Sequence, residues 1–215
     1  MDFYGTIGPA CAQLSTLQKM VDAGMTGLRM NLSHGSLAEH ANWLELIHQA
    51  GIRTLLIDLQ GPELRIGRLA APLPLRKGQS VLLGTGGIPC PACLLDAAAP
   101  GQELLLDDGK LLLQVDAADT ALHCTVLRGG VLQSRKSIAL PGVEVPSPTL
   151  TAEDLQNLRI AADCGVTGVM LPFVRSAADI RTLRAALEAA HAGHIQIFAK
   201  IENQAGVRAL PEFLP

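Results

Sequence analysis

The sequence is poor in aromatic residues, and it has no long apolar run and no basic run. Aromatic residues make up 3% of the 215 residues, so a core would have to be built from Leu, Ile, Val, Ala and Met. The formal net charge of −3 and the absence of a Lys/Arg cluster give no support for binding nucleic acid. No apolar stretch approaches the roughly 18 residues of a membrane helix, so no membrane association is expected.

Signals for export are also missing from the sequence. The N-terminus lacks the pattern of a signal peptide. The five cysteines are an odd number and are scattered, which fits a reducing compartment better than a disulfide framework. We therefore expect a cytoplasmic protein.

Short apolar segments alternate with amphipathic helical segments in two parts of the chain. The pattern predicts strands at 3–8, 26–31, 53–58, 167–171 and 195–199. Helices are expected after the N-cap residues Ser15, Ser36, Thr151, Ser176 and Asn203. Strands alternating with helices favour a parallel sheet with right-handed crossovers, which is the α/β class.

The residues at 68–146 break this alternation. Apolar segments at 104–106 and 111–113 flank Asp107-Asp108-Gly109-Lys110, and segments at 122–127 and 131–138 flank Arg128-Gly129-Gly130. Both patterns are typical of β-hairpins. We predict a small all-β domain at 68–146, inserted into an α/β domain formed by 1–67 and 147–215. The Cys90-Pro-Ala-Cys93 stretch has redox-motif spacing, but we interpret it as a plain loop without zinc.

Polar side chains follow three of the predicted strands, at their C-terminal ends. They are Arg29, Asn31, Ser33 and His34 after the second strand, Asp58 and Arg65 after the third, and Lys200 and Glu202 after the fifth. In a (β/α) barrel or a partial one, such residues surround a single opening. Cations beside carboxylates suit an anionic, phosphorylated substrate held with a metal ion, and hard oxygen ligands favour Mg²⁺ or an alkali cation over zinc.

Each of these residues also has a purely structural interpretation. Asp58 could cap a turn or pair with a neighbour, and Arg29 could form an inter-helix ion pair. Lys200 could extend to solvent, and His34 could hydrogen-bond its own loop. Their grouping after three different strands is what favours a site.

At these residues the sequence resembles the pyruvate kinase family. The resemblance rests on Thr6-Ile-Gly-Pro-Ala10, Leu28-Arg-Met-Asn-Leu-Ser-His-Gly35, Ile57-Asp-Leu-Gln-Gly-Pro-Glu-Leu-Arg-Ile-Gly67, Asp107-Asp-Gly109, Arg135-Lys136, Leu140-Pro-Gly142, Lys200-Ile-Glu-Asn203 and Gly206-Val-Arg208. The matches occur in order from residue 6 to residue 208. The resemblance implies a partial (β/α)8 TIM barrel, with five of eight strands, and an inserted lid domain.

The resemblance also implies a role for each matched residue. Arg29 would hold the phosphate of phosphoenolpyruvate, and Lys200 would stabilise the transferred phosphoryl group and the enolate. Glu202 would bind Mg²⁺ or Mn²⁺. A K⁺ ion would be held by Asn31, Ser33, Asp58 and the Leu59 backbone carbonyl, and the nucleotide ADP or ATP would be contacted by His34, Arg65 and Lys136. Such a full-length enzyme would be a homo-oligomer, expected to be a tetramer.

The sequence departs from the family pattern in three places. Leu59 and Gln60 stand where the family has threonine and lysine. The strand that supplies the second acidic metal ligand is missing, so we expect the 215 residues alone to be weakly active or inactive. Two alternatives are a non-catalytic truncated paralogue that binds anions or a partner, and a metal-dependent C–C lyase on a related barrel. The predicted lid and the Asn31–His34 loop argue against the lyase.

Overall fold

The computed structural model describes residues 1–143 and 145–213, and the chain forms two compact units. Unit 1 comprises Met1–Pro62 and Pro148–Pro215, and unit 2 comprises Glu63–Ser147. Glu144, in the predicted insert, and Leu214 and Pro215, at the end of the predicted barrel domain, lie outside the described residues. None of the helices in the described ranges is both long and apolar enough to span a membrane.

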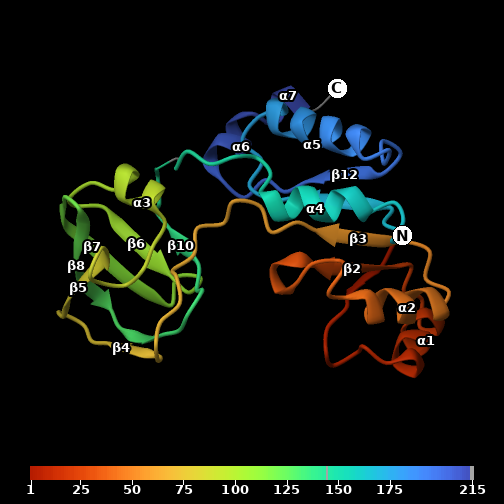
Figure 1. Ribbon diagram of the computed structural model, residues 1–215, viewed down its shortest axis with the longest axis horizontal. Coiled ribbons are helices and arrows are strands. Elements are labelled where there is room, and N and C mark those ends of the chain that lie inside the picture. The colour runs from red at the N-terminus through yellow and green to blue at the C-terminus, as the bar shows by residue number, and fades with distance from the viewer. Residues whose placement is uncertain (144, 214–215) are drawn as a thin grey trace. The chain divides into compact units, whose positions relative to one another are not determined.

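Unit 1 is built on a five-stranded parallel sheet (Figure 1). Its strands, in spatial order, are β1 (Tyr4–Thr6), β2 (Gly27–Asn31), β3 (Leu55–Asp58), β11 (Gly168–Leu171) and β12 (Gln196–Ala199). Every neighbouring pair is parallel. The predicted parallel sheet is confirmed, and all strand C-termini lie at the same edge.

Helices lie between these strands and after the last of them. They are η1 (Leu32–His34), α1 (Leu14–Asp22), α2 (Ala41–Gln49), α4 (Ala152–Ile160), α5 (Ala177–Ala189), α6 (Gln204–Arg208) and α7 (Leu210–Phe213). The caps predicted at Thr151, Ser176 and Asn203 are confirmed by their side-chain hydrogen bonds.

Two predicted helix starts are wrong. Helix α1 begins one residue before Ser15 and has Gln13 at its N-cap. Ser36 and Glu39 do exchange hydrogen bonds, from Ser36 N to Glu39 Oε2 at 2.7 Å and from Glu39 N to Ser36 Oγ at 3.2 Å. Those bonds close a separate turn, and α2 begins only at Ala41. A reciprocal Ser/Glu pair can thus stabilise an isolated turn before a helix.

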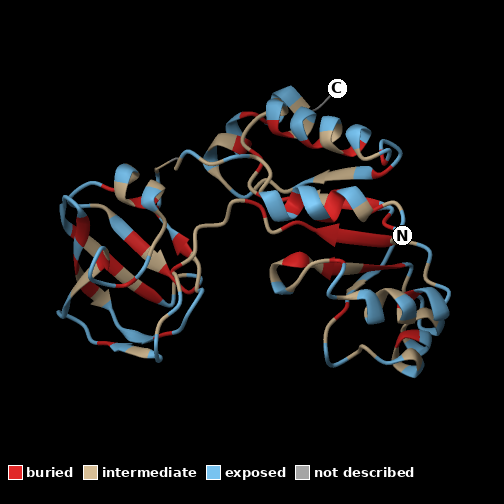
Figure 2. Ribbon diagram, viewed as in Figure 1, coloured by how far each residue is buried: buried red, intermediate tan, exposed pale blue. Residues whose placement is uncertain are grey.

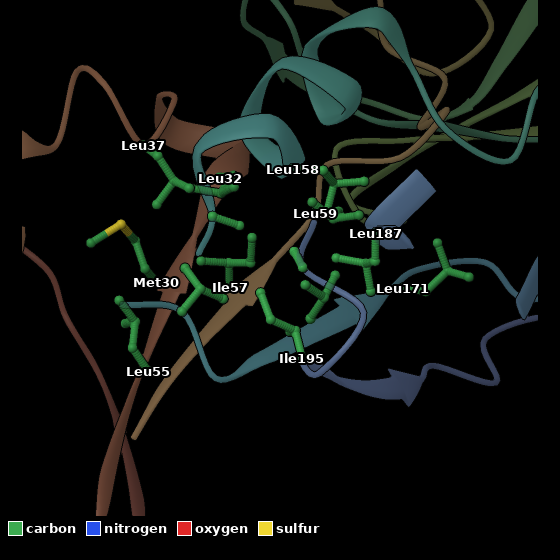
Figure 3. Packing of buried hydrophobic residues seen from close by; sticks show 14 of the residues in the cluster. Met30, Leu32, Leu37, Leu55, Ile57, Leu59, Leu158, Leu171, Leu187 and Ile195 are labelled. Carbon is green, nitrogen blue, oxygen red and sulfur yellow. The ribbon is translucent and has the colours of Figure 1, made fainter. Parts of the chain in front are cut away.

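The core of unit 1 lies on one face of the sheet. Leu28, Met30 and Ile57 are fully buried there and belong to the same cluster as Leu158 of α4 and Leu187 of α5. Figure 3 shows Met30, Ile57, Leu158 and Leu187. Successive residues of a strand point to opposite faces, so the alternate positions of β2 and β3 carry their polar side chains on the other face. Strand β3 is buried along its whole length (Figure 2), and its last residue is an aspartate.

Unit 2 contains two antiparallel sheets and its own buried cluster. The larger sheet has the order β10 (Ile138–Ala139), β6 (Glu103–Leu106), β7 (Leu111–Ala118), β8 (Ala121–Arg128) and β5 (Ser80–Gly84), and the smaller sheet pairs β4 (Leu73–Leu75) with β9 (Gly130–Leu132). The hairpin predicted around Asp107-Asp108-Gly109-Lys110 is confirmed as β6–β7.

The second predicted hairpin is wrong. Strand β9 pairs with β4 and not with β8. Gly129 explains the departure, because a Cβ at this position would lie 2.4 Å from the Leu75 carbonyl oxygen. The glycine lets the chain pass close to the backbone of the β4 end, which redirects it to another partner.

The structure also corrects the prediction of a plain loop at Cys90–Cys93. Cys93 lies in a short helix, α3 (Ala92–Ala97), which has Pro91 at its N-cap. The helix is fixed by Leu94, which is fully buried. Unit 2 is therefore mainly but not entirely β, in contrast to the all-β prediction. All five cysteines are free.

Candidate functional site at the strand C-termini

An arginine, an aspartate and a lysine from three strands form the centre of the candidate site. Arg29 lies in β2, Asp58 ends β3 and Lys200 directly follows β12. Arg29 donates from Nε and Nη2 to Asp58 Oδ2, at 3.1 and 2.5 Å. Lys200 Nζ donates to Oδ1 and Oδ2 of the same carboxylate, at 3.2 and 3.3 Å. Asp58 does pair with a neighbour, but the ion pair of Arg29 joins two strands and not two helices as the structural interpretation expected.

The three groups differ in their access to solvent. The Asp58 side chain is 3% exposed, whereas those of Arg29 and Lys200 are 29% and 26% exposed. The carboxylate therefore lies beneath the two cations and holds both of them. Burial of a charge is tolerated only when it is paired and hydrogen-bonded, and Asp58 has four such bonds.

Glu202 extends the charged cluster along the chain after β12. Its Oε1 lies 3.1 Å from Lys200 Nζ, and its Oε2 accepts a hydrogen bond from the Phe173 backbone amide at 3.2 Å. Lys200 is therefore shared by two carboxylates. Glu202 is 36% exposed, so its oxygens are more accessible than those of Asp58.

Thr6 belongs to the same edge, and our sequence analysis did not assign it to the site. Its hydroxyl accepts a hydrogen bond from Arg29 Nη1 at 3.2 Å, and Thr6 is the register partner of Arg29 in the β1–β2 ladder. The guanidinium is thus held from both neighbouring strands. The signal in the sequence was the position of Thr6 within the first predicted strand, together with its place in the first matched motif.

The loop after β2 places further oxygen groups beside Asp58. Asn31 is the register partner of Asp58, and its Oδ1 accepts from the Ser33 backbone amide at 3.1 Å. His34 ends η1 and is exposed. Leu59 is buried, and its amide donates to the Met170 carbonyl at 3.2 Å.

The two remaining candidate residues, Arg65 and Lys136, lie in unit 2. Arg65 pairs with Glu63 and donates to the Arg135 carbonyl at 2.8 Å. Lys136 Nζ lies 2.9 Å from Asp107 Oδ1, and Lys110 Nζ lies 3.3 Å from Oδ2 of the same residue. The hydrogen bond from Lys136 is the main reason that the pKa of the Asp107 carboxyl is below its ordinary value, and Lys110 adds to the effect.

The oxygen atoms that unit 1 offers as metal ligands suit an alkali cation better than a divalent cation. Amide, hydroxyl, carboxylate and carbonyl oxygens follow β2 and β3, which suits an alkali cation. For a divalent cation, Glu202 is the accessible carboxylate, and the described part of the chain contains no group of three or more His, Cys, Asp or Glu residues that could hold a metal.

Comparison with known proteins identifies the family to which this arrangement belongs. The family model described as "Pyruvate kinase, barrel domain" matches residues 2–215. The pyruvate kinase of Geobacillus stearothermophilus is 37% identical over 97% of this chain and 38% of its own length. That of Aeropyrum pernix is 36% identical over 96% of the chain and 47% of its own length.

A third relative, the pyruvate kinase of Mycobacterium intracellulare, is 34% identical over 94% of the chain and 46% of its own length. The chain therefore spans less than half the length of these curated relatives. The family match, in contrast, covers nearly every residue of the chain and includes all the strands and loops described above. The chain belongs to the pyruvate kinase family, through its barrel domain.

Proposed function

We propose that the protein containing this chain transfers a phosphoryl group from phosphoenolpyruvate to ADP, giving pyruvate and ATP. The observation that carries the proposal is the cluster of Arg29, Asp58, Lys200 and Glu202 at the C-terminal edge of a parallel sheet. Family membership gives the reaction, and the cluster offers the charges that such a reaction needs. Phosphoryl transfer depends mainly on positioning and on charge neutralisation.

Arg29 and Lys200 have complementary tasks in this proposal. Arg29 binds the phosphate of phosphoenolpyruvate, with its guanidinium oriented by Asp58 and Thr6. Lys200 neutralises charge on the phosphoryl group and on the enolate oxygen that remains when the P–O bond to it breaks. The phosphoryl group passes to a terminal oxygen of ADP, and the enolate gains a proton to become pyruvate.

The cations that the family uses would be held by residues of this chain. Glu202 would contribute one oxygen to Mg²⁺ or Mn²⁺, and a K⁺ ion would be held by Asn31, Ser33, Asp58 and the Leu59 carbonyl. When bound, these ions supply positive charge beside the phosphates. Lys200 forms ion pairs with both Asp58 and Glu202. Its positive charge offsets the repulsion between the two carboxylates.

The finer architecture is part of the same proposal. We infer that 1–67 and 147–215 form five strands of an eight-stranded barrel, and that 68–146 is an inserted lid. Lys136 of the lid would contact the nucleotide, together with His34 and with Arg65, which precedes the lid. The complete protein would be a cytoplasmic homo-oligomer, expected to be a tetramer.

A second candidate function is binding without catalysis, by a truncated paralogue. It is favoured by one observation, namely that the described residues contain no group of three or more His, Cys, Asp or Glu side chains that could hold a metal. Two proteins decide between the candidates in a coupled pyruvate assay: the 215-residue chain, and a fusion of this chain to the remaining segment of the G. stearothermophilus enzyme. We expect turnover from the fusion and little from the chain alone. A folded fusion without turnover would overturn the catalytic proposal.

A further inference from the structure

Helix α4 carries two buried polar side chains that lie outside the charged cluster. Asp154 is 1% exposed and Asn157 is 3% exposed. Their spacing of three residues places them on the same face of the helix. Asp154 lies at N3, where an aspartate is favoured, whereas the side chain of Asn157, in the helix interior, competes for backbone hydrogen bonds. The burial of both polar side chains requires specific partners.

Asp154 bonds with its own helix start and with a turn from a distant part of the chain. Its Oδ2 accepts from the amide and the hydroxyl of Thr151, both at 2.8 Å, which completes a capping box. Its Oδ1 accepts from the Gly61 amide at 3.4 Å. A capping box needs only the bonds to Thr151, so the contact with Gly61 is additional to capping.

Gly61 lies in a turn with little freedom to move. Its φ is +61°, in the region that favours glycine. A Cβ at this position would lie 2.6 Å from Cγ of Pro172. The turn follows Asp58 and Leu59 directly, so fixing Gly61 also fixes the end of β3.

Asn157 makes the equivalent contact with the loop after β2. Its Oδ1 accepts from the Leu37 amide at 2.8 Å, and Leu37 is fully buried beside α4 (Figure 3). The two residues are 120 positions apart in the sequence. Leu37 closes the loop that begins with η1 and contains Ser33 and His34.

We propose that α4 is a positioning element, in which Asp154 holds the turn after β3 and Asn157 holds the loop after β2. Ser33 and the Leu59 carbonyl, two of the groups assigned to the alkali cation, lie in these loops, and the other two, Asn31 and Asp58, end the strands that precede them. Helix α4 fixes the two loops relative to each other. The catalytic consequence rests on the function proposed above, whereas the structural consequence does not. Small displacements of such groups are costly, of the order of a hundredfold in rate for about 1 Å.

Amide hydrogen exchange in the 215-residue chain tests the structural part. Asn157→Leu keeps the volume but removes the acceptor, and we expect the Leu37 amide to exchange about tenfold faster, the loss typical of one buried hydrogen bond. Gln156→Leu, at an exposed position of the same helix, is the matched control and should leave that amide protected. Asp154→Ala should speed exchange at Gly61 in the same way.

Because Asp154 also caps α4, a matched control is needed. Thr151→Ala removes capping bonds but leaves the Gly61 contact, so it should weaken α4 while the Gly61 amide stays protected. Equal exchange at Gly61 in Asp154→Ala and Thr151→Ala would show that helix fraying alone is responsible, and it would overturn the role of Asp154. Unchanged exchange at Leu37 in Asn157→Leu would overturn the role of Asn157.

The fusion described above tests the consequence for the site. We expect Asn157→Leu to raise the half-saturating K⁺ concentration about tenfold, with Gln156→Leu close to wild type, at a temperature where all variants are folded. An unchanged K⁺ requirement beside faster Leu37 exchange would limit α4 to a structural role and overturn the proposal. If the wild-type fusion makes no pyruvate, the proposed function fails, while the exchange experiment still decides whether α4 holds the two loops.

Discussion

The two units of this protein bring charged side chains together in different ways. In unit 1, Lys200 contacts Asp58 although 142 residues separate them, because parallel strands end at a common edge. In unit 2, Asp107 pairs with Lys110 of its own hairpin loop and with Lys136 of the segment before β10. A parallel sheet thus gathers a site from distant segments, whereas an antiparallel hairpin forms one nearly from local sequence.

The largest effects on stability are expected from truncating a buried side chain in the core of each unit. Ile57→Ala deletes a fully buried side chain in unit 1, and Leu113→Ala does the same in unit 2. Each should lower the free energy of unfolding of its own unit by about 2–5 kcal/mol. Hydrogen exchange followed separately in β3 and β7 measures both effects. Equal loss of protection in both units from either variant would show that they unfold together.

Replacing Lys200, which pairs with both Asp58 and Glu202, tests the charged cluster of unit 1. In the fusion, Lys200→Met should lower kcat by about a hundredfold to a thousandfold, the usual loss for one electrostatic donor at a reacting oxygen. Lys19→Met, at an exposed position in α1, is the matched control and should retain activity. A similar kcat for the two variants would exclude Lys200 from the chemistry.

A smaller loss of stability is expected from removing the cap of α4, the first helix of unit 1 after unit 2. Thr151→Ala removes the N-cap side chain of α4 and should cost about 1 kcal/mol of stability. Denaturant unfolding of the chain, followed by far-ultraviolet circular dichroism, measures this loss. Thr182→Ala in α5 is a control, because Thr182 is exposed and its hydroxyl bonds only the preceding turn. Equal losses would mean that the cap adds nothing specific.

The smallest effect is expected from the local ion pairs of unit 2, and it depends on pH. Lys136 and Lys110 hold the pKa of Asp107 below its ordinary value. The pairing therefore stabilises the fold above the ordinary pKa, at about pH 4, and this stabilisation is lost as the pH falls through the lowered pKa. Lys136→Met should make unit 2 less sensitive to acid in this range.

Lys110→Met provides the comparison for that experiment. Its side chain is 67% exposed and that of Lys136 is 32% exposed, and exposed pairs contribute little. We expect a weaker change in the acid dependence of unfolding, measured by denaturant titration at several pH values. A larger change from Lys110→Met would reverse the assigned order of the two lysines.

The sequence predicted secondary structure well where the apolar periodicity and the helix caps agree. It predicted less well the features that depend on a contact between distant residues. The strands of unit 1 and the caps Thr151, Ser176 and Asn203 could be predicted because each depends on nearby residues. The pairing of β9 could not, since it depends on the approach of Gly129 to Leu75. For the site, the pattern indicated Arg29, Asp58 and Lys200, but the bond from Arg29 to Thr6 requires the register of β1 and β2.

The buried contacts of α4 could not be predicted from the sequence either. Asp154 is recognisable as half of a capping box, but nothing local indicates its bond to Gly61. Asn157 reads as one more polar helix residue until Leu37 is placed beside it. Predicting such contacts requires the crossing of helix and loop in three dimensions.

The strand order of unit 1 bears on how the chain is made. Spatial order in the sheet equals order along the chain, so each new strand joins the edge left by the previous one, and β1, β2 and β3 can pair before unit 2 is synthesised. Within unit 2, the segment at 64–67 bonds with the segment at 135–138, through Ile66 N to the Lys136 carbonyl and Ile138 N to the Leu64 carbonyl. Once unit 2 has folded, its first and last segments are held together by these bonds. The entropy lost in closing the loop between β3 and β11 is then that of a short connection. A large insertion can therefore interrupt a parallel sheet during synthesis at little cost to the pairing that follows.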